Sequence, residues 1–272
     1  MEIKSFNLFT LVTNNEFINF YNFKNIFELS IVDLISNTSY FVIDDGIRGI
    51  NKNSRVYIFI KDSPVSINEI INILINHYNN KKLNFEIKYI NSNIKLDNSD
   101  KYIIQKNFKT MELELNNFLN FNSICIPEDI KISTIDISKN IDLRIDIQNS
   151  IFNSNDKKRR PIDKNYLYKE LNSRYFLKDY CYVLFKDNKP IGYGQIIKDK
   201  NFYYLVNFGI IEEYRGKGYG NIFLNYVLND IKKKNEINLL RLNVDNYNIS
   251  AINLYKKIGF GEIFNTITLK SI

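Results

Sequence analysis

The sequence has no Trp, one His, two Cys and four Pro among its 272 residues. The cysteines, Cys125 and Cys181, are far apart and have no His or Asp at metal-ligand spacing, which argues against a disulfide framework and a zinc site. The first twenty residues contain no basic n-region, and no run in the sequence reaches about 18 apolar residues. We therefore expect a cytoplasmic protein with no membrane partner and no metal cofactor.

The charge balance is basic, with a formal net charge of +7 and a pI near 9.1. Most Lys and Arg residues are scattered among acidic ones, and only two clusters are dense, Lys157–Arg160 and Lys232–Lys234. The second cluster falls at the end of a helical pattern, where cations suit the carbonyl end of a helix. The charge alone therefore does not favour a nucleic acid partner, which would require salt-sensitive binding to a polynucleotide.

Glycine is also scarce, yet three of the ten glycines lie in one hexad, Arg215–Gly220. A β-like run (residues 202–211) precedes the hexad, and an amphipathic helical pattern begins near Asn221. A glycine-rich turn from strand to helix can direct its backbone N–H groups to one point, and the helix adds a partial positive charge there. The hexad therefore predicts a phosphate-binding loop. Neither a dinucleotide fingerprint nor a P-loop fits its spacing.

Arg-x-x-Gly-x-Gly between an apolar strand and a helix resembles the pyrophosphate loop of the GNAT superfamily of N-acetyltransferases. A second segment, Asn248–Phe260, resembles the Asn-x-x-Ala-x-x-Leu-Tyr-x-Lys-x-Gly-Phe stretch of that family almost residue for residue. The two motifs stand in the family's order, separated by a helical pattern and a strand. The resemblance covers residues 124–272.

The resemblance implies that acetyl-CoA is the acyl donor and assigns residues to its binding. The pyrophosphate would lie on the backbone N–H groups of the hexad, with Arg215 adding charge, and the pantetheine arm would pair with a bulged strand end. Ile210 aligns with the residue whose N–H polarises the thioester carbonyl. The cofactor-binding residues implied are Phe208, Gly209, Ile210, Arg215, Gly216, Lys217, Gly218, Tyr219, Gly220 and Asn248.

Two of the implied roles have structural alternatives. Tyr255 aligns with the Tyr that protonates the leaving thiolate, although an aromatic on an amphipathic helix can also be a core residue. Asn248 aligns with a pantetheine ligand, although Asn also favours helix N-termini. The general base stays unassigned, because Tyr204 stands where many relatives have a Glu.

The expected fold class is α/β (α+β): a mixed, mostly antiparallel central sheet flanked by helices, the GNAT acyl-CoA N-acyltransferase fold, with an additional N-terminal α/β domain. We expect an N-terminal domain at residues 1–116, a linker at 117–123 and the GNAT domain at 124–272. The N-terminal half repeats an order of strand, helix, strand and strand without a glycine loop. It is either a degenerate GNAT-like domain or an unrelated α/β domain.

The sequence thus predicts an N-acetyltransferase that transfers the acetyl group of acetyl-CoA to a primary amine by direct attack in a ternary complex. The alternative is a catalytically inactive sensor or regulatory module that binds acetyl-CoA or CoA, suggested by the missing acid at Tyr204. The sequence selects neither the amine acceptor nor the oligomeric state.

Overall fold

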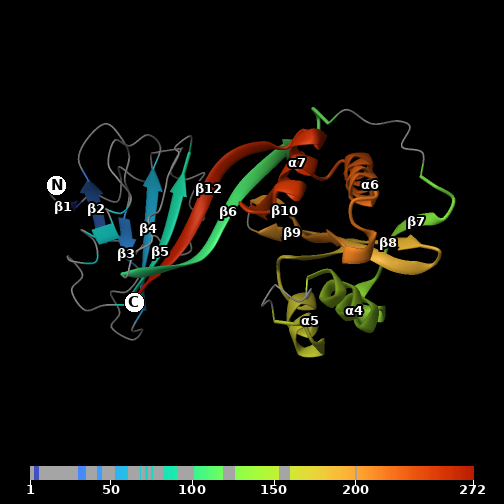
Figure 1. Ribbon diagram of the computed structural model, residues 1–272, viewed down its shortest axis with the longest axis horizontal. Helices are drawn as coiled ribbons and strands as arrows, with labels where there is room; N and C mark the ends of the chain where they lie inside the picture. The colour runs from blue at the N-terminus through green and yellow to red at the C-terminus, as the bar shows by residue number, and fades with distance from the viewer. Residues whose placement is uncertain are drawn as a thin grey trace. The chain divides into compact units, whose positions relative to one another are not determined.

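The structure is a computed structural model, shown in Figure 1. It describes residues 3–5, 30–34, 42–44, 53–60, 68, 71–72, 75, 82–90, 101–118, 126–152, 160–199 and 201–272. Residues 119–123 of the predicted linker and 157–159 of the basic cluster lie outside these ranges. None of the helices in the described ranges is both long and apolar enough to cross a membrane.

The chain divides into two compact units. The first contains residues 1–110, 245–247 and 263–272, and the second contains residues 111–244 and 248–262. The predicted division into residues 1–116, 117–123 and 124–272 stays a prediction.

The second unit is built on a sheet with the order β7-β8-β9-β10-β11, followed by the part of β6 from Met111 onward. Its strands are β6 (Tyr102–Glu114), β7 (Ile130–Thr134), β8 (Phe176–Lys186), β9 (Lys189–Asp199), β10 (Phe202–Ile210) and β11 (Leu239–Asp245). The strands from β7 to β10 pair antiparallel, and β10 pairs parallel with β11. This mixed, mostly antiparallel sheet confirms the predicted fold class.

Helices cover both faces of this sheet (Figure 1). They are α4 (Ile141–Phe152), α5 (Lys164–Leu171), α6 (Tyr219–Lys234) and α7 (Ile249–Ile258). One apolar cluster joins α6 and α7 to the sheet through fully buried side chains such as Phe223 and Val227. A smaller cluster, with Ile147 and Ile151 of α4, covers the other face. Burial of these apolar surfaces is the main force that holds the helices on the sheet.

Local sequence explains most helix boundaries. Asp163 begins α5 by accepting a hydrogen bond from the Tyr166 N–H, and Gly259 in the left-handed conformation ends α7. Helical periodicity alone predicts a helix over residues 165–176. The observed helix is shorter: α5 ends at Leu171, and Phe176 already pairs with Ile197 of β9. Strand pairing therefore overrides the helical periodicity at that point.

The strand β10 contains an irregularity that shapes its end. Its register with β9 shifts between Val206 and Gly209, and Asn207 has a left-handed φ of 53°. Asn tolerates this conformation better than most residues, and such a bulge bends the strand and redirects its side chains. The bulge precedes the glycine hexad by a few residues, so it sets the direction in which the chain enters the predicted loop.

We expect Asn207→Val to lower the stability of this strand end by about 1–2 kcal/mol, since a β-branched residue is strained at positive φ. Asn207→Gly should preserve the bulge, because glycine adopts this φ freely. Amide hydrogen exchange in β10 measures both effects. Equal protection in the Val variant and the wild type would show that the bulge does not depend on Asn207.

The first unit has the strand order β1-β2-β3-β4-β5-β12, followed by the part of β6 up to Thr110. Its other strands are β1 (Ile3–Ser5), β2 (Ser30–Leu34), β3 (Val42–Asp44), β4 (Asn53–Ile60), β5 (Lys82–Tyr89) and β12 (Gly261–Ser271). The strands from β1 to β4 pair antiparallel, β4 pairs parallel with β5, and β12 pairs antiparallel with β5.

The strand order from β1 to β5, and the directions of these strands, repeat those from β7 to β11 in the second unit. This repetition is what a duplicated fold requires. It supports the proposal that the N-terminal half is a degenerate GNAT-like domain rather than an unrelated one.

Candidate acyl-CoA site

A pocket of about 330 Å³ lies within the second unit, at the end of β10. Four segments line it: the last turn of α4, the end of β10, the stretch from Tyr214 through the glycine hexad to the start of α6, and the first two turns of α7. The lining residues are Ile151, Phe152, Phe208, Gly209, Ile210, Tyr214, Arg215, Gly216, Tyr219, Gly220, Asn248, Ser250, Ala251, Leu254 and Tyr255.

The glycine hexad has the geometry of an anion-binding turn. Gly216 and Gly218 have φ angles of 73° and 84°, and Gly218 is the N-cap of α6. A Cβ at either glycine would meet nothing within 4 Å, so both backbones face open space. The first turn of α6 contains no acidic residue, and no side chain caps it. Its first N–H groups and the positive end of the helix dipole are therefore available to a phosphate group.

The two cations of the hexad are placed differently. Arg215 lines the pocket, and its Nε and Nη2 donate hydrogen bonds to the backbone oxygens of Ile210 and Ile151, at 2.9 and 2.8 Å. Lys217 does not line the pocket, and its Nζ donates to the Glu213 carbonyl at 3.0 Å. Lys217 is therefore directed toward the preceding turn.

The end of β10 has an unpaired edge on the side of β11. The two strands pair only from Tyr203 to Leu205 on β10, although β10 continues to Ile210. Ile211 N–H donates to the Ile191 carbonyl of β9, so its neighbour Ile210 has its own N–H and C=O directed away from β9. An extended ligand could pair with this edge as an additional strand would.

The helix α7 supplies another wall of the pocket. Asn248 is its N-cap, and the Oδ1 of Asn248 accepts a hydrogen bond from the Ala251 N–H at 3.3 Å. Asn248 also lines the pocket, so the two predicted roles of this residue are compatible. The α7 side chains Ser250 and Leu254 complete this wall.

Tyr255 lines the pocket but is only 7% exposed. Its ring packs edge-on against Phe260 at 5.8 Å and lies 6.5 Å from the ring of Phe208. Burial raises the pKa of the Tyr255 phenol well above its usual value. The phenol therefore keeps its proton throughout the neutral range. Tyr255 is therefore both a residue of the core and part of the pocket wall.

The position of the expected acid is occupied by Tyr204, near the start of β10. Burial raises the pKa of Tyr204, and a hydrogen bond with Arg241 opposes this shift. Arg241 is itself paired with Glu112, at 2.6 Å between Nε and Oε2, and lies over the ring of Phe202. Tyr204 is therefore part of a charged cluster and is not itself a group that would accept a proton near neutral pH.

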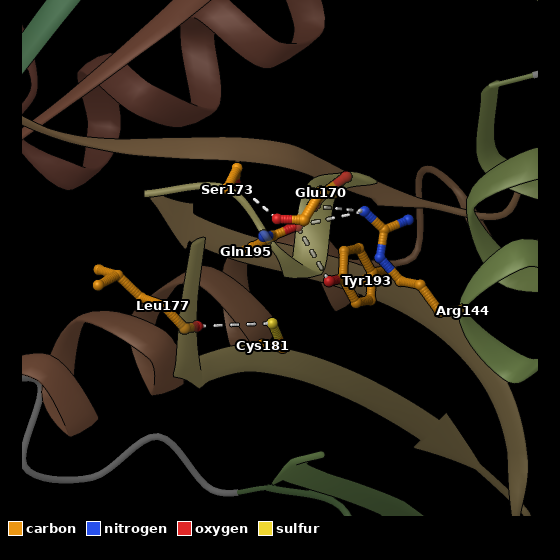
Figure 2. A network of polar contacts seen from close by, with 7 residues as sticks. All are labelled: Arg144, Glu170, Ser173, Leu177, Cys181, Tyr193 and Gln195. Carbon is orange, nitrogen blue, oxygen red and sulfur yellow. Dashed lines mark hydrogen bonds and ion pairs between the residues drawn. The ribbon is translucent and has the colours of Figure 1, made fainter. Parts of the chain in front are cut away.

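A second polar network lies between α4, α5 and β9 (Figure 2). The guanidinium of Arg144 is stacked over Tyr193 at 4.0 Å, and its Nη2 is 3.2 Å from Gln195 Oε1 and 3.8 Å from Glu170 Oε1. Arg144 and Gln195 are completely buried, and Glu170 is 5% exposed. None of these residues lines the pocket, so the network supports α4 and α5 rather than the ligand directly.

The structure brings nine of the eleven predicted site residues into this one pocket; Lys217 and Gly218 do not line it. Sequence reasoning missed Ile151, Phe152 and Tyr214, together with three residues of α7. Ser250, Ala251 and Leu254 lie in the recognised Asn248–Phe260 segment, so their helical spacing from Asn248 and Tyr255 was a usable signal. Ile151 and Phe152 reach the pocket through the packing of α4, for which the sequence offers no local sign.

The strand order of the second unit and the glycine turn at the start of α6 agree with the fold class predicted from the sequence. Residues 147–260 match the family model described as Acetyltransferase (GNAT) family. The C-terminal part of the chain therefore contains a GNAT acetyltransferase domain, which confirms the predicted family and the predicted enzyme class. Acetyl-CoA is the acyl donor of that family.

Solved structures share the fold over most of the chain. A GCN5-related N-acetyltransferase from Sphaerobacter thermophilus has a TM-score of 0.58 and 12% identity, covering 94% of this chain and 84% of its own. A GNAT-family acetyltransferase from Colwellia psychrerythraea has a TM-score of 0.52 and 11% identity, covering 100% of both chains.

A tandem GNAT protein from the clavulanic acid biosynthesis pathway has a TM-score of 0.52 and 13% identity, covering 88% of this chain and 81% of its own. At these identities the likeness concerns the fold alone. No curated protein sequence matches the chain.

We expect Gly218→Ala to weaken CoA binding by about 5- to 30-fold, because a left-handed φ costs a residue with a Cβ about 1–2 kcal/mol. The turn would relax from that conformation, and its N–H groups would no longer converge on the phosphate. Gly261→Ala is the matched control, since its Cβ also meets nothing within 4 Å, its φ is ordinary and it lies outside the pocket. Isothermal titration with CoA compares the two, and unchanged affinity in the Gly218 variant would argue against the loop as the phosphate site.

Proposed function

We propose that this protein binds acetyl-CoA in the pocket at the end of β10 and transfers the acetyl group to a primary amine by direct attack in a ternary complex. The observation that carries the proposal is the convergence of the glycine hexad, the open edge of β10 and the Tyr255 phenol on one pocket of the second unit. The reaction needs three features: a loop that binds the diphosphate, a strand edge that pairs with the extended pantetheine arm, and a proton donor for the leaving sulfur.

The residues present fit the donor. The open space at Gly216 and Gly218 admits a diphosphate close to the backbone, and Gly220 lets α6 approach Leu254 of α7. In the proposal, the remaining cofactor-binding residues are those predicted above, with Lys217 and Gly218 acting through the backbone of the turn. When bound, acetyl-CoA would supply a thioester whose C–S bond breaks as the amine nitrogen bonds to the acetyl carbon.

Two groups of the protein would act on the reacting atoms. The Ile210 N–H points to the open edge of β10, where it would donate a hydrogen bond to the carbonyl oxygen and stabilise its developing negative charge. The Tyr255 phenol would donate its proton to the departing sulfur. The proton lost by the amine would leave through water, since β10 carries no acid.

The burial and protonation of Cys181 favour direct transfer over a covalent acyl-enzyme intermediate. This thiol is completely buried, does not line the pocket, and burial raises its pKa to about 11. A thiol that stays protonated is a poor nucleophile. The other cysteine, Cys125, lies outside the described residues.

One observation supports a second function. Tyr204 stands in place of the expected acid, in the charged cluster that also contains Arg241 and Glu112. A pocket that binds CoA but lacks a base would serve as a sensor or regulatory module. Such a module would bind acetyl-CoA and show no turnover.

Initial-rate kinetics with acetyl-CoA and an amine panel test the proposal. The panel contains a polyamine, an amino acid, an aminoglycoside and a peptide with a free N-terminus and a Lys. We expect thiol release that depends on one of these amines, with intersecting double-reciprocal lines, as a ternary complex requires. CoA binding without turnover on any amine would favour the sensor, and parallel lines would indicate a covalent intermediate.

A further inference from the structure

The hydrogen bonds of Arg215 suggest a function for this residue other than attraction of the pyrophosphate. Nε and Nη2 are both engaged with backbone carbonyls, those of Ile210 on β10 and Ile151 on α4. The two carbonyls come from segments that are 59 residues apart in the sequence (210 − 151) and lie on two walls of the same pocket. The planar fork of a guanidinium can make both bonds at once, whereas an ammonium group is a single point of charge.

Each of these carbonyls needs such a partner. Ile151 is in the last turn of α4, where carbonyl oxygens have no partner within the helix. Ile210 directs its carbonyl oxygen to the open edge of β10, the same side as its N–H. A bare carbonyl dipole at that edge would repel a developing oxyanion. The bond from Arg215 neutralises this dipole and leaves the Ile210 N–H as the group that the edge presents.

We infer that Arg215 is a positioning residue for the acyl-transfer step: its guanidinium joins the end of α4 to the end of β10 and fixes the Ile210 peptide group. The effect of Arg215 on the acyl-transfer step rests on the proposed function. The clamp itself, defined as the two bonds from Arg215 to Ile151 and Ile210, is a property of the protein without ligand.

A comparison of two acyl donors distinguishes this positioning role from attraction of the pyrophosphate. S-acetylpantetheine carries the thioester and the pantetheine arm but no diphosphate. A residue that only attracts the diphosphate matters for acetyl-CoA and not for S-acetylpantetheine. A residue that positions the Ile210 peptide group matters equally for both donors.

The variant is Arg215→Lys, which keeps the positive charge and removes the fork. Its matched control is Arg174→Lys, an exposed Arg of the second unit that lies outside the pocket. We expect Arg215→Lys to lower kcat/KM by about 10- to 100-fold with acetyl-CoA and by the same factor with S-acetylpantetheine, since a small misplacement of a reacting group has effects of this size. Arg174→Lys should match the wild type with both donors.

Hydrogen exchange without ligand gives a readout that does not depend on turnover. In Arg215→Lys we expect faster exchange at the amides of the last turn of α4 and of residues 210–214, and no change in β8. Unchanged exchange at both segments, or a loss of kcat/KM confined to acetyl-CoA, would overturn the inference. If the wild-type protein turns over neither donor, the proposed function fails, and the exchange comparison still decides whether the clamp exists.

Discussion

Tyr255→Phe is expected to lower turnover by about 10²- to 10⁴-fold, the usual contribution of a positioned general acid, with little change in CoA affinity. The phenol is the only proton-donating side-chain group on the α7 wall besides Ser250 and Asn248, both of which lie at the start of the helix. Burial raises its pKa, so the acid form persists into the alkaline range. The rate loss should therefore be the same across the neutral range.

The ring of Tyr255 supports this test, because it packs against Phe260 and Phe208 independently of the hydroxyl. The Phe variant keeps these contacts, so its fold and its CoA affinity should be preserved. Tyr226→Phe, on α6 and outside the pocket, is the matched control and should have wild-type turnover. Thiol release and titration with CoA are measured on the same preparations. A fully active Tyr255→Phe enzyme would leave Tyr255 with only its role in the core.

Glu170→Ala is expected to lower the stability of the second unit by about 3–5 kcal/mol, because it leaves the charge of Arg144 buried without a counter-charge. Arg144 is completely buried between α4 and β9, and Glu170 is the acid beside its guanidinium (Figure 2). Among the described residues, Arg144 Nη1 and Glu170 Oε2 have no hydrogen-bond partner within the protein. Each charge therefore depends strongly on the other.

The matched control uses the exposed ion pair of the same two helices, Asp142 of α4 with Lys164 of α5, at 2.9 Å. These side chains are 73% and 60% exposed, so Asp142→Ala should change stability little. The double variant Arg144→Met/Glu170→Leu removes both charges and should recover most of the loss caused by Glu170→Ala. Free energies of opening from amide exchange in β9 measure all three variants. Equal protection in Glu170→Ala and Asp142→Ala would show that the buried pair contributes no more than the exposed one.

The parts of the site that sequence could predict are those encoded by short segments. The glycine hexad and the Asn248–Phe260 segment are local patterns, and their conformations follow from glycine φ angles and a helix cap. Most of the strands and helices of the second unit could be predicted for the same reason. The end of α5 could not, because the pairing of Phe176 with Ile197 decides it and periodicity does not register strand pairing.

The contacts that support the site depend on residues far apart in the chain. Arg144 meets Gln195 across 51 positions, and Arg215 meets Ile151 across 64. In a single sequence, such polar residues are predicted to lie on the surface. Their neighbours in the sequence do not indicate that the fold will bury them or supply hydrogen-bond partners. The resemblance implied a role for the charge of Arg215, and only the fold shows that two of its nitrogens are bonded to the backbone.

The central claim is that acetyl-CoA binds with its diphosphate on the glycine hexad and its arm along the end of β10. Amide hydrogen exchange of the wild-type protein with and without acetyl-CoA tests this claim most directly. We predict slower exchange at residues 208–210 and at residues 216–221 on addition of acetyl-CoA, with no change in β7 at the far edge of the sheet. Protection elsewhere in the chain, with unchanged exchange at both segments, would contradict the account.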